Sequence, residues 1–182
     1  NNLVEVCFNN MANYQKEVFN ISNKEVFGYF IEMGLGKTFI SISDMLRYFD
    51  IVDKFIIVLP VNLIDYWKLE MKKHADGILD SKIEILKYST LSGMSIMDLF
   101  NFFFFFADKN IMFILDESTY AKNVTSSRGR NLLNILIMYQ ARKNKKTIVR
   151  VLTGTPFSNN VEQIHGQMCL LCPLIVIDKT LI

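Results

Sequence analysis

Short apolar runs, rich in β-branched and aromatic residues, recur along the chain at 55–59, 83–86, 111–115 and 147–152. A weaker fifth run, 26–31, lies directly before a glycine-rich stretch. Apolar and polar residues do not alternate strictly within these runs, which is typical of strands that are buried on both faces of a parallel sheet. We therefore predict five strands, of which the first along the chain is the weakest.

Three of the segments between these runs carry apolar residues at helical spacing, namely 38–49, 63–74 and 128–139. In the last of them, leucine and isoleucine repeat at steps of three to four residues, the pattern of a helix with one buried face. Strands and helices alternate, and no repeat or linker interrupts them. This order predicts one α/β domain over 1–182, with an open, mostly parallel sheet and helices on both faces.

The 182-residue chain is 51% hydrophobic and 21% charged, a composition that favours a compact fold over a disordered chain. Its 20 Lys and Arg residues nearly balance its 18 Asp and Glu residues, so the net charge of +2 does not by itself indicate a nucleic-acid partner. Binding to nucleic acid would need a local basic patch. The clearest candidate is the basic run 142–146, for which a plain solvated surface is the alternative.

The three cysteines, Cys7, Cys169 and Cys172, are an odd set without the spacing of a disulfide framework, which suits a reducing, intracellular compartment. His165 could share one helical face with the last two. A structural zinc site normally needs four ligands, however, and no fourth is near in the sequence. We therefore expect buried small side chains here and no structural metal.

Five consecutive phenylalanines occupy 102–106, between Asp98 on one side and Asp108 and Lys109 on the other. The stretch is much shorter than the ~20 apolar residues of a membrane-spanning helix. We expect it to be core, or a surface that another domain covers, and we expect no membrane partner. Because the first residues lack both an initiator Met and the layout of a signal peptide, the chain is expected to be a piece of a longer protein.

The segment 32–38 reads EMGLGKT and follows the weakest predicted strand. A glycine-rich turn between a strand and a helix presents backbone N–H groups to phosphate, and the dipole of the helix adds partial positive charge. The residues predicted to hold the nucleotide here are Gly34, Leu35, Gly36, Lys37 and Thr38. Lys37 would reach the β- and γ-phosphates, and the Thr38 hydroxyl would coordinate Mg²⁺. The full phosphate-loop pattern has glycine where Ile31 stands, so a turn that merely caps a helix is the alternative.

An acidic pair, Asp116 and Glu117, follows another apolar run. The carboxyl ends of strands are where open α/β sheets bind ligands. Magnesium prefers one or two carboxylates with waters and phosphate oxygens, so Asp116 is a candidate metal ligand. Glu117 can orient or deprotonate an attacking water, which makes Lys37, Asp116 and Glu117 the candidate catalytic residues. A helix cap is the alternative, since Ser118 and Thr119 follow directly.

A turn with two hydroxyl groups, Thr153, Gly154 and Thr155, follows the last apolar run and precedes Pro156. It is expected near the same edge of the sheet as the acidic pair. Hydroxyl groups on a stiff turn can bond to the acidic segment and shift when the γ-phosphate leaves, which would make this turn a coupling element. A simple tight turn is the alternative.

In this order the motifs resemble those of the first RecA-like domain of the Swi/Snf family, the helicase-like, DNA-dependent ATPases of superfamily two. The resemblance covers 14–173 and rests on four segments: EMGLGKT at 32–38, IIVLPVNLIDYWKLE at 56–70, LDESTYAKN at 115–123 and VLTGTPFSNN at 151–160. The first lacks only the family's leading residue, where Ile31 stands. The third includes the trailing Lys122 and Asn123, and the last is the most diagnostic of the four.

The resemblance implies a RecA-like phosphate-loop domain that uses ATP and Mg²⁺. Tyr14 and Gln15 are similar to an upstream pair in which Gln contacts adenine. Double-stranded DNA is the implied partner, contacted mostly through backbone and hydroxyl groups. The residues that would face it are Pro60, Asn62, Leu63, Ser89 and Thr90. A second RecA-like lobe with an arginine finger is also implied, and without it we expect weak nucleotide binding and poor hydrolysis.

One departure concerns Thr119, which stands where many relatives carry His, so coupling between the acidic motif and the turn is expected to differ. A strand-separating helicase or a restriction-system motor would have the same phosphate site. A degenerate, non-catalytic scaffold lobe is a third hypothesis, motivated by Ile31, Thr119 and the phenylalanine run. The expected location is intracellular: nuclear for a eukaryotic protein, cytoplasmic for a viral or bacterial one.

Overall fold

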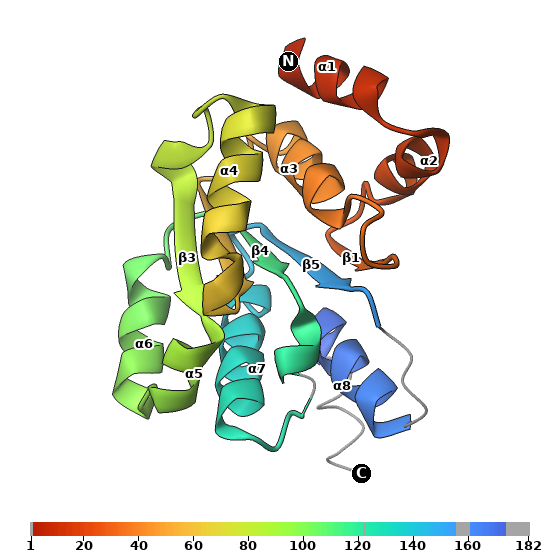
Figure 1. Ribbon diagram of the computed structural model, residues 1–182. Helices are drawn as coiled ribbons and strands as arrows, with labels where there is room; N and C mark the ends of the chain where they lie inside the picture. The colour runs from red at the N-terminus through yellow and green to blue at the C-terminus, as the bar shows by residue number, and fades with distance from the viewer. Residues whose placement is uncertain (1, 122, 156–160, 174–182) are drawn as a thin grey trace.

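The computed structural model describes residues 2–121, 123–155 and 161–173. All five predicted strands are present, and they form one parallel sheet in the order β1-β5-β4-β2-β3. Their bounds are β1 Val26–Phe30, β2 Lys54–Leu59, β3 Ile83–Lys87, β4 Ile111–Leu115 and β5 Thr147–Thr153. The predicted fold class, an open parallel sheet with helices on both faces, is confirmed (Figure 1).

The helices lie in two layers, one on each face of the sheet (Figure 1). The first layer contains α1 (Asn2–Asn10), α2 (Asn13–Ile21), α3 (Lys37–Arg47) and α4 (Ile64–Ala75). The second contains α5 (Tyr88–Gly93), α6 (Ile96–Phe105), α7 (Ser127–Gln140) and α8 (Val161–Leu171). Three short 3₁₀ turns complete the described part: Val61–Leu63, Asp80–Lys82 and Ser118–Ala121.

The strand order explains this division. The connections through α3 and α4 cross the sheet in one direction, from β1 to β2 and then to β3, whereas those through α5, α6 and α7 return to β4 and then to β5. Because strand–helix–strand crossovers between parallel strands are right-handed, reversing the direction moves the helices to the opposite face. All strands therefore end at one edge of the sheet, and the loops that follow them meet there.

The predicted helices 38–49, 63–74 and 128–139 correspond to α3, α4 and α7, with ends that differ by one or two residues. Helices α1, α2, α5, α6 and α8 were not predicted. Helix α6 has a clear local start, because the Ser95 hydroxyl accepts from the Asp98 N–H at 3.3 Å while the Asp98 carboxylate accepts from the Ser95 N–H at 2.8 Å. None of the helices in the described ranges is long and apolar enough to cross a membrane.

The phenylalanine run lies at the carboxyl end of α6 and is divided between core and surface. Phe102 and Phe103 pack against the Tyr139 ring, with ring centroids 6.3 and 5.2 Å apart, and Phe106 is buried. Phe104 and Phe105 are 69% and 75% exposed. Expecting core was therefore right for part of the run only, because one helix cannot turn five consecutive side chains to the same side.

A buried ion pair fixes α3 to the sheet. The Arg150 guanidinium of β5 donates to the Asp44 carboxylate of α3 at 2.6 Å, and neither side chain is accessible to solvent. The Tyr29 hydroxyl of β1 donates to the same carboxylate at 3.1 Å, and Arg47 lies 3.2 Å from its other oxygen. Burial and the Asp44 charge raise the pKa of Tyr29, so its hydroxyl remains a donor. The remaining Arg150 N–H groups donate to main-chain carbonyls, among them that of Ser22 at 3.0 Å.

We expect Asp44→Asn to lower the free energy of unfolding by about 3–5 kcal/mol, because it leaves the Arg150 charge buried without a counter-charge. Urea denaturation followed by circular dichroism measures this change. Asp108→Asn is the control, since Asp108 pairs with Lys109 at 2.8 Å on the exposed surface and its loss should not shift the unfolding midpoint. Equal midpoints for the two variants would contradict a structural role for the buried pair.

Candidate functional site

The predicted phosphate loop connects β1 to α3. Gly34 and Gly36 have φ angles of 82° and 78°, in the left-handed region that favours glycine, and Gly36 is the N-cap of α3. The 11-residue helix α3 begins directly after it, so the positive end of its dipole faces the loop. The loop thus has the backbone conformation that an anion-binding turn requires.

Lys37 is folded back into this loop. Its ammonium group donates to the main-chain carbonyls of Ile31 at 2.9 Å and Glu32 at 3.2 Å. Thr38, in the same first turn of α3, is also buried. Neutral carbonyl groups bind an ammonium less strongly than phosphate oxygens do. Lys37 can therefore exchange these partners for the phosphates of a nucleotide.

The upstream pair Tyr14 and Gln15 lies against the same loop. The Tyr14 hydroxyl and the Gln15 side-chain amide both donate to the Leu35 carbonyl, at 3.0 and 3.1 Å. The other end of the Gln15 amide accepts from the Ala12 N–H at 2.9 Å. A Cβ added to Gly36 would come within 2.4 Å of the Gln15 amide nitrogen. The pair that resembles an adenine-binding motif is therefore adjacent to the predicted phosphate loop.

The acidic pair follows β4 directly, at the edge where the strands end. Asp116 is buried; one carboxylate oxygen accepts from the Trp67 indole N–H at 2.7 Å and the other from the Glu117 N–H at 2.9 Å. Burial raises the pKa of Asp116, opposed by these two hydrogen bonds and by the positive charge of Lys37. Burial and the Asp116 charge raise the pKa of Glu117, again opposed by Lys37. The positive charge of the Lys37 ammonium group therefore stabilises the ionised form of both carboxyl groups.

The donor set suits a magnesium ion. An ionised carboxylate has about four lone-pair sites, and the two hydrogen bonds that Asp116 accepts from the described part of the chain use one on each oxygen. The Thr38 hydroxyl, at the start of α3, is a second oxygen ligand of the kind that Mg²⁺ takes beside phosphate. Hard oxygen donors from the loop and the acidic segment thus fit this metal.

The turn 153–155 lies against the phosphate loop. A Cβ added to Gly154 would meet Met33 Cγ at 2.7 Å and Lys37 Nζ at 3.3 Å. Thr153 is fully buried, and its hydroxyl oxygen accepts from the Thr155 N–H at 3.1 Å. The loop and the turn therefore meet at the edge of the sheet where β4 and its acidic pair end, and the Lys37 charge acts on both acidic side chains. Pro156 lies outside the described residues, as does Lys122 of the acidic motif.

The residues expected to face DNA are at the same edge, at the ends of the adjacent strands β2 and β3. Asn62, in the turn after β2, is exposed, and so are Ser89 and Thr90 at the start of α5. Pro60 is buried, and Leu63 is half-buried against the core.

No protein-family model matches the chain. Among curated proteins of Saccharomyces cerevisiae, nuclear protein STH1/NPS1 is 26% identical over 79% of the chain, helicase SWR1 28% over 93%, and the ISWI chromatin-remodeling complex ATPase ISW2 27% over 82%. The solved SWI2/SNF2 ATPase core of Sulfolobus solfataricus covers 91% of the chain in its complex with dsDNA, with a TM-score of 0.68 and 18% identity. The same core domain solved alone covers 90%, with a TM-score of 0.65 and 22% identity.

The chain is a homologue of the Swi/Snf-type ATPases. Its fold is that of the RecA-like part of their ATPase core. It spans only 11–14% of the length of the curated relatives and about a third of each solved core, 36% and 35%. Most of each relative therefore lies outside the region of similarity.

Ser118, rather than Thr119, links the acidic motif of this Swi/Snf homologue to β5. The Ser118 hydroxyl is fully buried, 3.2 Å from the Leu152 carbonyl and 2.7 Å from the Gln167 side-chain oxygen. Thr119 is half-buried. Ser118 thus connects the acidic motif to β5 and to α8.

Sequence reasoning missed several residues that build the site, among them Met33, Trp67, Tyr88, Ser118 and Gln167. Of these, Met33, Trp67 and Ser118 had a signal, because they belong to the motifs at 32–38, 56–70 and 115–123. The others act through contacts between segments that are distant in sequence.

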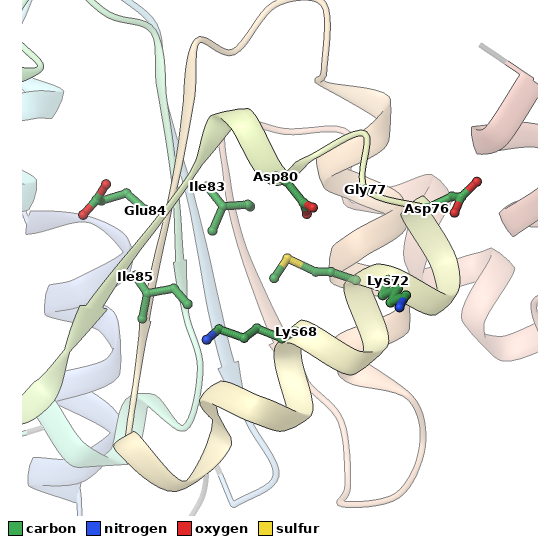
Figure 2. A pocket seen from close by; sticks show the side chains of 9 residues that line it. Lys68, Lys72, Asp76, Gly77, Asp80, Ile83, Glu84 and Ile85 are labelled. Atoms are coloured by element: carbon green, nitrogen blue, oxygen red, sulfur yellow. The ribbon is translucent and has the colours of Figure 1, made fainter.

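Two other candidate sites lie away from this edge. A groove of about 810 Å³ lies between α4 and β3, lined by Lys68 and Lys72 on α4 and by Ile83 and Ile85 on β3 (Figure 2). None of its lining residues belongs to the phosphate loop or to the acidic pair. The Cys169 sulfur lies 3.6 Å from a ring nitrogen of His165, but within the described ranges no three His, Cys, Asp or Glu residues gather into a group that could hold a metal.

We expect Gly36→Ala to weaken binding of a fluorescent ATP analogue with Mg²⁺ by about tenfold. The left-handed backbone costs about 1–2 kcal/mol for a residue with a Cβ, and that Cβ would also displace the Gln15 amide. Fluorescence anisotropy measures the affinity. Gly93→Ala is the matched control, because nothing lies within 4 Å of its added Cβ. A loss of affinity in both variants, or in neither, would count against the loop as the nucleotide site.

Proposed function

We propose that this chain is the ATP-binding lobe of a DNA-dependent ATPase that couples hydrolysis to movement on, or remodelling of, double-stranded DNA. The observation that carries the proposal is the closeness of Gly154 to the Lys37 ammonium, whose charge also acts on Asp116 and Glu117, at one edge of a RecA-like sheet. The relatives support it, since one is named a chromatin-remodeling complex ATPase and another a helicase.

In this proposal the N–H groups of 34–38 and the Lys37 ammonium bind the β- and γ-phosphates, and Gln15 selects adenine. Thr38 and Asp116 hold Mg²⁺, which when bound neutralises charge that develops between the β- and γ-phosphates. Glu117 accepts the proton of the water that attacks the γ-phosphorus. Its raised pKa makes it a stronger base than an ordinary carboxylate.

The turn at Thr153, Gly154 and Thr155 is proposed to report loss of the γ-phosphate. Gly154 lies close enough to the Lys37 ammonium that a movement of this group, when its phosphate partner leaves, reaches the turn directly. From there Ser118 and Gln167 extend the contact to α8. A small displacement at the phosphate can thus reach a whole helix.

Duplex DNA is proposed to lie over Asn62, Ser89 and Thr90, which are exposed at the ends of two adjacent strands. Amide and hydroxyl groups suit contacts to phosphate oxygens without sequence preference. The solved SWI2/SNF2 core bound to dsDNA supports a duplex rather than a single strand.

A second RecA-like lobe would supply an arginine finger, worth about 10³ to 10⁵ in rate in related phosphoryl transfers. For a eukaryotic source we propose a nuclear location, because one relative is named a nuclear protein.

The test measures ATP turnover of this lobe joined to a second RecA-like lobe, with and without duplex DNA. We expect duplex DNA to raise turnover, and Lys37→Ala to abolish both turnover and Mg²⁺-dependent ATP binding. Lys24→Ala, an exposed lysine before β1, is the matched control and should change neither.

Equal turnover with and without DNA would rule out the motor. Absence of any Mg²⁺-dependent ATP affinity would instead favour a scaffold lobe, and displacement of one strand from a duplex would favour a helicase.

A further inference from the structure

Two buried aromatic residues next to the segments that are proposed to face DNA donate hydrogen bonds to Asp116. The Trp67 indole N–H donates to the Asp116 carboxylate at 2.7 Å, and the Tyr88 hydroxyl donates to the Asp116 main-chain oxygen at 3.0 Å. Trp67 and Tyr88 are 0% and 1% exposed, so neither can contact DNA or a nucleotide itself. Their polar groups act through Asp116.

Trp67 belongs to the first turns of α4, which begins at Ile64 directly after the turn Val61–Leu63. That turn is closed by the Leu63 N–H, which donates to the Pro60 carbonyl at 3.0 Å. Because a helix moves as a rigid unit over one turn, a displacement of 61–63 carries the Trp67 indole with it. The exposed Asn62 is thus connected mechanically to the Asp116 carboxylate.

Tyr88 gives the second connection. It is the first residue of α5 and precedes Ser89 and Thr90, which are exposed at the end of β3. Its ring stacks on that of Tyr120 in the acidic segment, with centroids 5.7 Å apart and an interplanar angle of 12°. Burial, with the nearby charges of Asp116 and Glu117, raises the pKa of Tyr88 far above its ordinary value, so its hydroxyl stays a donor.

The orientation of the Asp116 carboxylate depends on few contacts. From the described residues its two oxygens accept one hydrogen bond each, from Trp67 and from the Glu117 N–H. The second bond comes from the adjacent residue, so Trp67 is the long-range contact that sets the rotation of the carboxylate plane. Rotation of this plane redirects the lone pairs that remain for a metal ion.

We propose that Trp67 and Tyr88 are positioning residues that couple DNA contact at 61–63 and 89–90 to the geometry of the Asp116 metal ligand. The inference rests on the proposed function and goes beyond it by naming the route from DNA to the metal site. Coupling of this kind is reciprocal: DNA changes the affinity for the Mg²⁺-nucleotide complex by the same factor as the complex changes the affinity for DNA.

The first test measures this factor on the full 182-residue chain. The affinity for a fluorescent, non-hydrolysable ATP analogue with Mg²⁺ is determined with and without a saturating short DNA duplex. In the native chain we expect the two affinities to differ by about fivefold or more. Trp67→Phe and Tyr88→Phe remove the donor and keep an aromatic ring, and each should bring the ratio close to one.

Tyr139→Phe is the matched control, because it also removes a buried hydroxyl, one that donates to the Phe102 and Phe103 carbonyls away from the site. This variant should keep the native ratio. If Trp67→Phe and Tyr88→Phe both keep it as well, the proposal is overturned, and the proposed function stands. If the native chain does not bind the nucleotide at all, the proposed function fails first.

The second test uses the native chain and therefore does not depend on how a variant folds. Trp67 is its single tryptophan, so its fluorescence emission reports on the hydrogen bond to Asp116. We expect an emission shift on adding duplex DNA and on adding the analogue with Mg²⁺, but not with the analogue in EDTA. Duplex binding, verified with a labelled duplex, without any change in Trp67 emission would overturn the proposal.

A metal titration separates positioning from simple packing. Mn²⁺ affinity in the presence of the analogue, read from the relaxation rate of water protons, should fall about 10- to 100-fold in Trp67→Phe, because a residue that orients a metal ligand has an effect of this size. Affinity for the analogue without metal should not change. Equal losses with and without metal would mean that Trp67 only supports the fold, and would contradict the proposal.

Discussion

The buried ion pair between Asp44 and Arg150 determines where the candidate site can form. Asp44 lies on α3 about two turns, roughly 10 Å, after Lys37, and Arg150 precedes the turn at Gly154 by four residues in the extended strand β5. Lys37 and Gly154 meet again at the edge of the sheet. Helix α3 and strand β5 are therefore joined at two points: at the buried ion pair, and at the site, where Lys37 lies against Gly154. Because this charge pair fixes α3 near its carboxyl end, the helix cannot slide along the strand without separating the pair, so the phosphate loop at the other end of the helix is held in position as well.

The electrostatics at the edge keep the site open to a ligand. If Lys37 formed a direct ion pair with Asp116, a metal–triphosphate complex would have to break a buried charge pair before it could bind. Instead, the ammonium group binds the carbonyls of Ile31 and Glu32, while Asp116 accepts from an indole and an amide. Positive and negative groups are thus close enough to influence each other and are held apart by neutral partners. Burial raises the pKa of both carboxyl groups because it disfavours their negative charge. A bound cation would offset this cost, so the arrangement favours a cation such as Mg²⁺.

Much of the fold could be predicted because its causes are local. Apolar runs, helical spacing and the glycines of the loop act over a few residues, so the five strands and the helices α3, α4 and α7 were found within one or two residues. The contacts that position the site are not local. Trp67 and Asp116 are 49 residues apart in sequence, and Asp44 and Arg150 are 106 apart. Arg150 stands within an apolar strand, where the sequence shows a charge but not the partner that makes its burial possible.

The backbone conformation of Glu117 is unusual for a residue that is not glycine. Its φ of 46° lies in the left-handed region, which is unfavourable for a residue with a Cβ and would suit glycine. The conformation persists because both main-chain groups of Glu117 are bonded: its N–H donates to the Asp116 carboxylate at 2.9 Å, and its carbonyl accepts from the Tyr120 N–H at 2.9 Å. Glycine would relieve the strain and would remove a carboxylate from the edge of the sheet. A strained backbone that carries a charged side chain beside a buried acid is expected at a site where chemistry, rather than stability, determines the residue.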